Sequence, residues 1–197
     1  MQALIVIDVQ NDFCDGGALA VPGGSEVVQG INALMDEFPA VILTQDWHPA
    51  GHSSFASSQP GRVPYDLVAM PYGDQVLWPD HCVQGTPGAA FHPDLDATRA
   101  DLILRKGFRA EVDSYSAFFE NDHHTPTGLA GYLRERGISA VTLVGLATDF
   151  CVNYSAVDGA RLGLTVTVRE DLTRAIDLGG SLARAREAWA EAGIRAA

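Results

Sequence analysis

Several side chains able to do acid–base, nucleophilic or metal chemistry follow short apolar segments of this sequence. Asp8 follows LIVI, Asp46 and His48 follow AVILT, Lys106 ends DLILRK, and Cys151 lies just beyond SAVTLVG. In open parallel sheets, ligands bind beyond the carboxyl ends of the strands. If these segments are parallel strands, the side chains are therefore expected to converge on one site.

Cys151 lies between a strand-like segment and CVNYSAVDGARLG, which has apolar residues at helical spacing and ends at Gly163. The N-terminus of a helix stabilises a thiolate, although a buried, inert cysteine is also common. Asp8 could take the thiol proton, and the ammonium of Lys106 could stabilise both charges. The alternative is a buried Asp8–Lys106 ion pair, but beside Cys151 the trio favours catalysis. Backbone N–H groups in ATDFC would form the oxyanion hole.

A metal site is predicted from Asp46 and His48 in TQDWHP and from His81 in PDHCVQG. A carboxylate and imidazoles suit a divalent ion such as Zn²⁺, Fe²⁺ or Mn²⁺. His52 follows in the same loop, and its role stays open between ligand, supporting group and loop residue. The remaining histidines and cysteines are interpreted as turn, surface or inert buried residues: His92, His123, His124, Cys14 and Cys82.

The elements that must position these groups are short apolar strands alternating with helices. Strands are predicted at residues 3–9, 40–44, 101–106, 139–145 and 164–168, all buried on both faces. Helices are predicted at residues 23–38, with Ser25 as the N-cap, and at 125–137, 151–163 and 181–192. This alternation indicates an α/β fold with a mainly parallel sheet covered by helices on both faces.

Residues from about 46 to 95 depart from that pattern, because they are rich in Pro, Gly, Ser and His and show no periodicity. Aromatic residues such as Trp47, Phe55 and Trp78 argue against disorder. A metal bound at both ends of the segment would offset the entropy of closing so long a loop. We therefore expect a single domain over residues 1–197 with a metal-stapled irregular segment.

Composition narrows the class of protein further. The chain has 197 residues, 47% of them hydrophobic, with a formal net charge of −12, which is ordinary globular composition and disfavours nucleic acid and anionic membranes as partners. No apolar run reaches membrane-spanning length, and the N-terminus lacks the basic region of a signal peptide. The 3 cysteines form no disulfide framework, so a reducing, cytoplasmic setting is expected.

Together, these stretches resemble the nicotinamidases, within the isochorismatase-like cysteine hydrolases. The resemblance is carried by IDVQNDFCDGGALAVPGG (7–24), TQDWHPAGHSSF (44–55), WPDHCVQGTPGAAFHPDL (78–95), RKGF (105–108), SYSAFF (114–119) and GLATDFCV (145–152). It implies a three-layer α/β/α fold and hydrolysis of nicotinamide to nicotinate and ammonia in NAD salvage, with pyrazinamide as a further substrate. The short spacing in HPAGH leaves the role of His52 open.

The resemblance also implies roles for individual residues. Asp8, Lys106 and Cys151 would be the catalytic trio, and Asp46, His48 and His81 would hold one divalent metal ion. A cis peptide bond would fall at Leu146–Ala147, with the N–H groups of Ala147 and Cys151 as oxyanion donors. Phe13, Trp78 and Tyr115 would bind the pyridine ring. Metal identity and oligomeric state, a homo-oligomer included, stay open.

Two alternatives remain at this point. Another amide or carbamoyl hydrolase of the same superfamily would share Asp8, Lys106 and Cys151 without needing the metal. A non-catalytic binding protein would use Asp46 and the two histidines as a closed structural site. Ammonia release from nicotinamide before and after chelation separates these possibilities.

Overall fold

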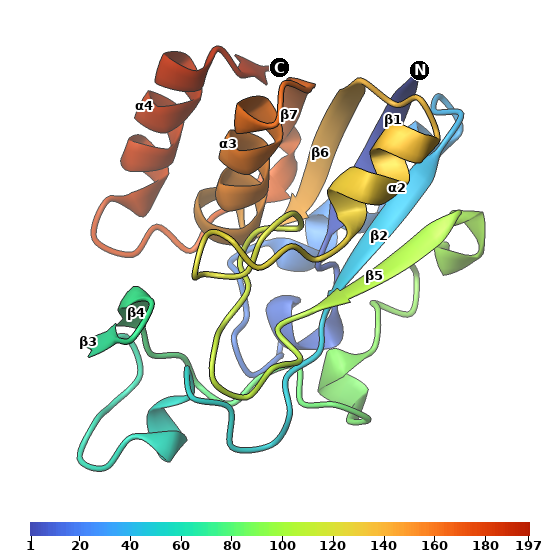
Figure 1. Ribbon diagram of the computed structural model, residues 1–197. Coiled ribbons are helices and arrows are strands. Elements are labelled where there is room, and N and C mark those ends of the chain that lie inside the picture. Colours follow the sequence, from blue (N-terminus) through green and yellow to red (C-terminus); the bar gives the residue numbers. More distant parts are fainter.

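The computed structural model describes residues 1–197 and is built on a six-stranded sheet in which all neighbouring strands run parallel (Figure 1). The strand order is β5-β2-β1-β6-β7-β8. The strands are β1 (Gln2–Ile7), β2 (Val41–Asp46), β5 (Leu102–Lys106), β6 (Ala140–Leu146), β7 (Thr165–Arg174) and β8 (Arg195–Ala196). All five predicted strands are present, and the short β8 is an addition.

Helices cover both faces of this sheet. They are α1 (Val28–Met35), α2 (Leu129–Glu135), α3 (Asn153–Arg161) and α4 (Ser181–Ala192). The connection from β1 to β2 runs toward the β5 edge, whereas those through α2, α3 and α4 run the other way. Because such crossovers are right-handed, α1 lies on one face and the other three on the opposite face, in front of the sheet in Figure 1. The α/β/α prediction is confirmed.

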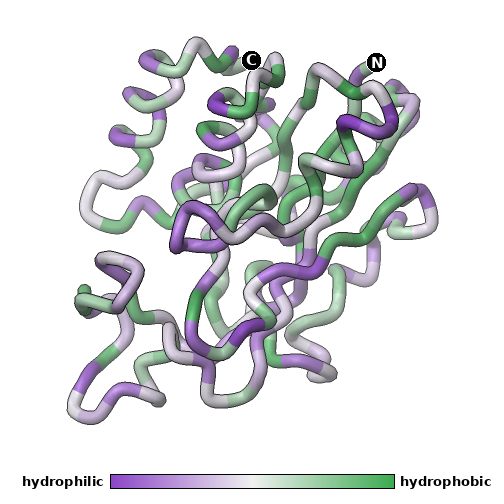
Figure 2. The backbone as a smooth tube through the Cα atoms, viewed as in Figure 1, coloured by the Kyte–Doolittle hydropathy of each residue, from purple (hydrophilic) through white to green (hydrophobic).

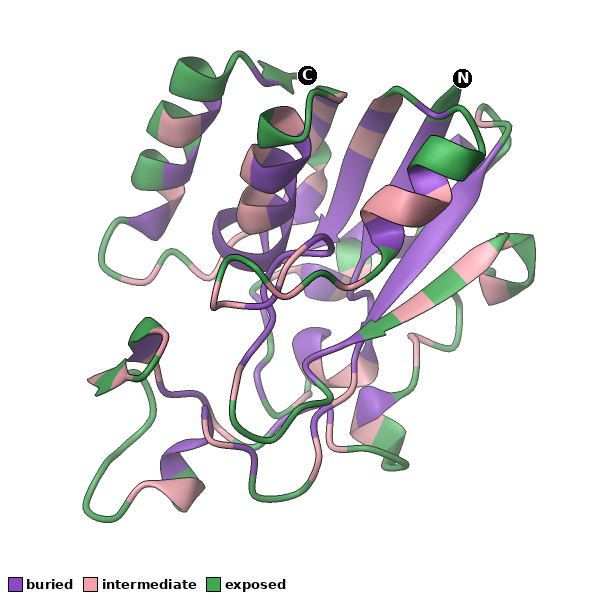
Figure 3. Ribbon diagram, viewed as in Figure 1, coloured by how far each residue is buried: buried purple, intermediate pink, exposed green.

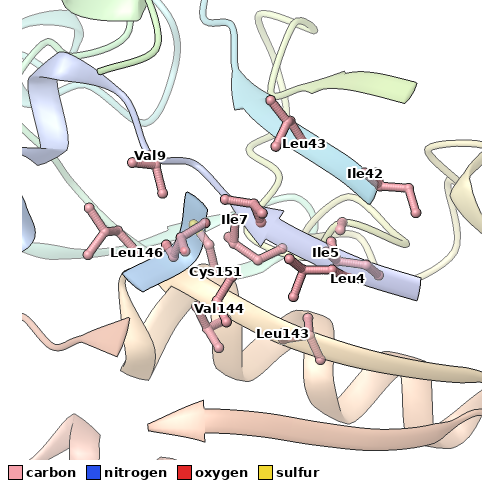
Figure 4. Close-up of a cluster of buried hydrophobic side chains, with 14 of the residues drawn as sticks. Leu4, Ile5, Ile7, Val9, Ile42, Leu43, Leu143, Val144, Leu146 and Cys151 are labelled. Carbon is pink, nitrogen blue, oxygen red and sulfur yellow. The ribbon is translucent and has the colours of Figure 1, made fainter. Parts of the chain in front are cut away.

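The three central strands carry the core. Every residue of β2 and β6 is buried or half-buried, and β1 is buried after its first residue. Figure 4 shows their apolar side chains gathered around Ile7, with Cys151 within the same cluster. The hydropathy and burial views show the same central band (Figures 2 and 3).

The prediction that all five strands are buried on both faces was wrong for β5 and β7. Exposure alternates along β5, where Ile103 is 47% exposed, because β5 is an edge strand. In β7 the same alternation marks a strand that pairs with β6 on one side and only with the two-residue β8 on the other. Alternation of this kind is what a strand shows when one face is solvated.

The first helix begins differently from the prediction. Gly24–Val27 form a 3₁₀ turn and regular α-helix begins at Val28, so Ser25 is not an N-cap. Its hydroxyl instead accepts a hydrogen bond from the Asp15 N–H at 3.2 Å. The turn is set by a tertiary contact, since a Cβ at Gly24 would lie 2.6 Å from the Phe13 carbonyl oxygen.

The irregular segment 46–95 contains local structure that the sequence did not reveal. Its hairpin consists of β3 (Leu67–Met70) and β4 (Gly73–Val76). Phe55 and Trp78 are buried and form a backbone bridge, and a second bridge joins His48 to Val83.

Short helical turns occur both inside and outside this segment. The 3₁₀ helices are Asn11–Phe13, Ala56–Ser58, Pro87–Ala89 and Ala97–Arg99, and a π-helical turn spans Thr148–Val152. No helix is long and apolar enough to cross a membrane.

Candidate active site

The ends of four adjacent strands bring the predicted catalytic groups together. Asp8 follows β1 directly, Asp46 and Lys106 are the paired last residues of β2 and β5, and Cys151 lies in the π-helical turn after β6. Asp8 has a φ of 49°, a left-handed conformation that Asp tolerates better than most residues. This turn at the end of β1 allows its side chain to meet groups from β2, β5 and the turn.

Lys106 lies between the Cys151 thiol and two carboxylates. Its Nζ is 3.6 Å from Cys151 Sγ and 2.8 Å from Asp8 Oδ2, and it donates hydrogen bonds to Asp46 Oδ1 and to the Ser114 carbonyl oxygen. The contact with Asp46 was not predicted, because Lys106 was expected to act on Asp8 and Cys151. The ammonium therefore joins the catalytic groups to a predicted metal ligand.

Asp8 is set up to accept a proton. Its Oδ1 accepts a hydrogen bond from Thr44 Oγ1, and its buried Oδ2 lies 2.8 Å from Lys106 Nζ. Burial raises the pKa of Asp8 to about 6, against the lowering effect of Lys106. Asp8 is therefore a carboxylate that is ionised at neutral pH and basic enough to take a proton.

The burial of Cys151 favours the neutral form of its thiol. Cys151 is 6% exposed, and this burial raises the pKa of its thiol well above the usual value. The charge of Lys106 lowers this pKa, whereas the carboxylates of Asp8 and Asp46 raise it. Burial therefore opposes the stabilising effect that a helix N-terminus has on a thiolate. An Asp8 oxygen lies within 4.8 Å of the sulfur, so a proton acceptor is close to the thiol.

The predicted metal ligands lie side by side. Asp46 Oδ2 is 3.7 Å from His48 Nε2 and 4.0 Å from His81 Nε2, and all three residues are buried. His48 Nδ1 is 2.9 Å from the Gly107 carbonyl oxygen, and His81 Nδ1 is 2.8 Å from that of Pro79. These carbonyls hold the protons on Nδ1, so both Nε2 atoms are left to face Asp46.

The contacts and donor atoms of these three residues suit a divalent cation. His48 Nε2 is buried with no hydrogen-bond partner, which is costly unless a ligand takes its lone pair. Burial, together with the neighbouring His48, lowers the pKa of His81 to about 4, so its imidazole is in the neutral form that binds metals. One carboxylate and two imidazoles form an N/O donor set of the kind seen in zinc sites.

His52, whose role the sequence left open, is occupied by protein groups. Its Nδ1 lies 2.8 Å from Ser54 Oγ, and its Nε2 lies 2.8 Å from the Arg109 carbonyl oxygen. The His52 ring also packs against His48, with centroids 4.6 Å apart. With both nitrogens engaged, His52 supports the ligand His48 and is not itself placed as a ligand.

Asp113 was missed by the sequence reasoning. It is buried, lines the cavity described below, and places Oδ1 3.9 Å from His48 Nε2. No spacing connects it with TQDWHP, because it comes from the irregular loop after β5. A carboxylate seven residues beyond Lys106 in a loop gives no periodic signal.

The turn that carries Cys151 is fixed on both sides. The Leu146–Ala147 peptide bond is cis, as the resemblance implied, and a π-helical turn follows it. The buried carboxylate of Asp149 accepts hydrogen bonds from the N–H groups of Ile176 and Asp177, at 3.0 and 2.8 Å, and from Ser181 Oγ. Asp149 thereby ties the turn to the segment before α4.

A pocket lined mostly by hydrophobic side chains opens beside the Cys151 sulfur. Phe13, Trp78 and Tyr115 all line this cavity together with Cys151 and Ala147. The metal-side residues Asp46 and His81 line it too, and the additional apolar walls come from Leu19, Phe150 and Ile176.

The remaining histidines and cysteines lie outside this cluster, as predicted. Cys14 and Cys82 are buried free thiols whose pKa values burial raises. His123 and His124 are exposed and His92 is half-buried.

The sequence of this chain matches a known protein family over nearly its whole length. The isochorismatase domain family matches residues 2–191. The chain belongs to the isochorismatase family. Within it, a nicotinamidase of Acinetobacter baylyi is 55% identical over 189 residues, which cover 96% of this chain and 87% of the relative.

Solved structures agree with this placement. A nicotinamidase and pyrazinamidase of Acinetobacter baumanii superposes with a TM-score of 0.98 at 52% identity, covering 99% of this chain and 94% of the other. Yeast nicotinamidase bound to the inhibitor nicotinaldehyde gives 0.92 at 31% identity, covering 100% and 99%. A pyrazinamidase of Pyrococcus horikoshii in complex with zinc gives 0.79 at 33% identity, covering 100% and 98%. Relatives of this chain therefore include amidohydrolases, a zinc-bound structure and a structure with a small pyridine ligand.

Proposed function

We propose that this protein is a nicotinamidase, which hydrolyses nicotinamide to nicotinate and ammonia in NAD salvage and also accepts pyrazinamide. The observation that carries the proposal is the placement of the Cys151 sulfur in an aromatic cavity whose other side is formed by Asp46 and His81. A thiol flanked by an acid and an ammonium suits attack on an amide, and a flat aromatic slot suits a pyridine ring. Relatives that carry the nicotinamidase name at 55% and 45% identity support the same substrate.

Substrate binding uses the walls of the cavity. Phe13, Trp78 and Tyr115 contact the pyridine ring and direct its carboxamide toward Cys151. Asp46, His48 and His81 hold one divalent ion, for which Zn²⁺ is the first choice and Fe²⁺ or Mn²⁺ the alternatives. When bound, this ion supplies a Lewis acid that orients the ring nitrogen. Orientation of this kind lowers the barrier by several kcal/mol.

The chemistry proceeds through a covalent intermediate. Asp8 Oδ2 takes the Cys151 proton as Sγ attacks the amide carbon, and the N–H groups of Ala147 and Cys151 bind the resulting oxyanion. The carbon–nitrogen bond then breaks as Asp8 returns the proton to the departing ammonia, which leaves a thioester on Cys151. Asp8 next takes a proton from water, which attacks the thioester, releases nicotinate and restores the thiol. Lys106 stabilises the negative charges of Asp8 and the sulfur throughout.

The wider setting follows from the same residues. Residues 1–197 form one hydrolase domain in which the ion joins both ends of the segment 46–95. The separate free thiols of Cys14, Cys82 and Cys151 support a reducing, cytoplasmic setting. The substrate is a small molecule, and neither nucleic acid nor membrane is a partner.

Ammonia release from nicotinamide tests the proposal. The wild-type protein is expected to release ammonia, to lose this activity after chelation and to regain it with added Zn²⁺, Fe²⁺ or Mn²⁺. Cys151→Ala should abolish turnover while circular dichroism and melting temperature stay close to wild type. Release of ammonia from an N-carbamoyl substrate but not from nicotinamide would favour the carbamoyl hydrolase, and no hydrolysis of either would favour a binding protein.

A further inference from the structure

Gln75 in β4 is a buried glutamine that does not line the ring cavity but contacts residues that do. It is 1% exposed, although β4 belongs to a two-stranded hairpin outside the main sheet. Its Nε2 donates to Tyr115 Oη and to the Val76 carbonyl oxygen, both at 2.7 Å, and lies 3.2 Å from Asp113 Oδ2. A carbonyl oxygen and a carboxylate accept but do not donate, so the amide nitrogen must face them.

The other end of the same amide is also used. Gln75 Oε1 accepts hydrogen bonds from Asn121 Nδ2 at 3.0 Å and from Tyr72 Oη at 3.2 Å. Asn121 in turn accepts the Tyr115 N–H through its Oδ1 at 3.0 Å. Tyr115 is therefore held at its backbone through Asn121 and at its hydroxyl by Gln75 directly.

The Tyr115 hydroxyl joins a second wall of the cavity to this network. Trp78 Nε1 donates to the same oxygen at 2.9 Å, and the two rings stand nearly perpendicular, with centroids 6.1 Å apart. Neither residue lies in a strand of the sheet: Trp78 comes from the irregular segment and Tyr115 from the loop after β5. The spacing between these walls therefore depends on side-chain bonds and not on the strand register that fixes Asp8, Asp46 and Lys106.

We propose that Gln75 is a positioning residue that fixes the width of the ring slot by holding Tyr115, and through its hydroxyl Trp78, in place. The same amide contacts Asp113, whose Oδ1 lies 3.9 Å from His48 Nε2. Gln75 therefore also connects the ring slot to the predicted metal ligands. A fully satisfied buried polar network is rigid, and rigid walls lower the entropic cost of binding a flat ligand. This inference rests on the proposed function and adds to it a determinant of ring affinity.

A double-mutant cycle tests it. Gln75→Leu, Tyr115→Phe and the double variant are compared by the KM for nicotinamide and by calorimetric titration with nicotinate. Each single change is expected to raise KM and the nicotinate Kd about tenfold, the equivalent of about 1.4 kcal/mol. The double variant should be little worse than either single one, because both changes break the same bond. The kcat should change much less, since Asp8, Lys106 and Cys151 are held elsewhere.

Gln59→Leu is the matched control. Gln59 lies in the same irregular segment and donates one hydrogen bond from Nε2 to the Ser53 carbonyl oxygen at 2.8 Å, but it does not line the cavity. It should lower the melting temperature without changing KM. If Gln75→Leu does not fold, Gln75→Met keeps the length of the side chain, removes the donor without adding charge, and should raise KM in the same way.

The outcomes are distinct. Effects of Gln75→Leu and Tyr115→Phe that multiply to about a hundredfold would overturn the inference, because the two residues would then act independently. A loss of stability with unchanged KM would overturn it as well, since Gln75 would be merely structural. A wild-type protein that neither binds nor hydrolyses nicotinamide would instead show that the proposed function is wrong, and the positioning role with it.

Discussion

Replacing Lys106 by methionine isolates the charge at the centre of the site. Lys106 is 1% exposed and its ammonium lies 2.8 Å from Asp8 Oδ2. At an effective dielectric constant of about 20, two unit charges at this distance attract by about 6 kcal/mol. This attraction offsets much of the cost of burying ionised Asp8. Methionine keeps a long flexible side chain in place of the lysine stem, so the change removes charge with little loss of packing.

The expected loss of stability depends on pH. Removing one partner of a buried ion pair costs about 3–5 kcal/mol. Asp8 can limit this cost by taking a proton, because its pKa is already about 6 with Lys106 present and rises further without it. The native variant then binds more protons than the unfolded chain, so its free energy of unfolding falls as pH rises. We expect a loss of about 3 kcal/mol at pH 8 and a clearly smaller one at pH 5.

The same proton disables catalysis. Protonated Asp8 cannot accept the Cys151 proton, so kcat/KM at pH 7.5 should fall about 10²–10⁴-fold, the usual contribution of a general base. Urea unfolding at both pH values and a coupled ammonia assay measure the two effects. Arg134→Gln is the control, because Arg134 is exposed on α2, far from the site, and should leave both unchanged. A Lys106→Met protein with wild-type kcat/KM, or with the same stability loss at pH 5 and pH 8, would refute the reasoning.

Further predictions concern the base, the metal and its support. Because the pKa of Asp8 is about 6, kcat/KM of the wild-type enzyme should fall about tenfold per pH unit below that value and level off above it; a profile flat down to pH 4 would exclude Asp8 as the base. If the metal is present at a hundred times its Kd, its removal by a chelator should lower the melting temperature, measured by calorimetry, by about 5–10 °C. An unchanged melting temperature would contradict the idea that the metal stabilises the segment 46–95. Gly107→Ala should weaken metal affinity about 10–100-fold in competition titrations, since its Cβ would lie 2.5 Å from the His48 ring. Gly61→Ala has a similarly positive φ but meets open space, so equal metal affinity in the two variants would count against this steric argument.

The strands and helices with a regular apolar pattern could be predicted from the sequence. Strands buried on both faces, such as β1, β2 and β6, give continuous apolar runs, and parallel pairing places their ends together. Asp8, Asp46 and Lys106 could therefore be assigned to one site before any coordinates were known. The last helix was predicted with its observed limits, Ser181–Ala192, because Ala, Arg and Glu dominate it.

The missed features depend on contacts that no local pattern encodes. Ser25 has the right chemistry for an N-cap, yet the packing of Gly24 against Phe13 gives the chain a 3₁₀ turn instead. Asp113 and Gln75 gain their importance from partners far away in sequence, and each lies in a segment without periodicity. The resting protonation state of Cys151 depends on its burial, which a sequence does not quantify.

The order of strands has a consequence for how activity arises during synthesis. The four strands that carry the site are neighbours in the sheet but occupy residues 2–7, 41–46, 102–106 and 140–146 of the chain. β1 cannot acquire β6 as its partner, nor Asp8 its thiol neighbour, until about three quarters of the polypeptide has left the ribosome. Parallel pairing over such separations is slow, because long loops must close first. A nascent or truncated chain thus has no assembled nucleophile, and after dilution from denaturant the recovery of turnover should follow the pairing of β1 with β6.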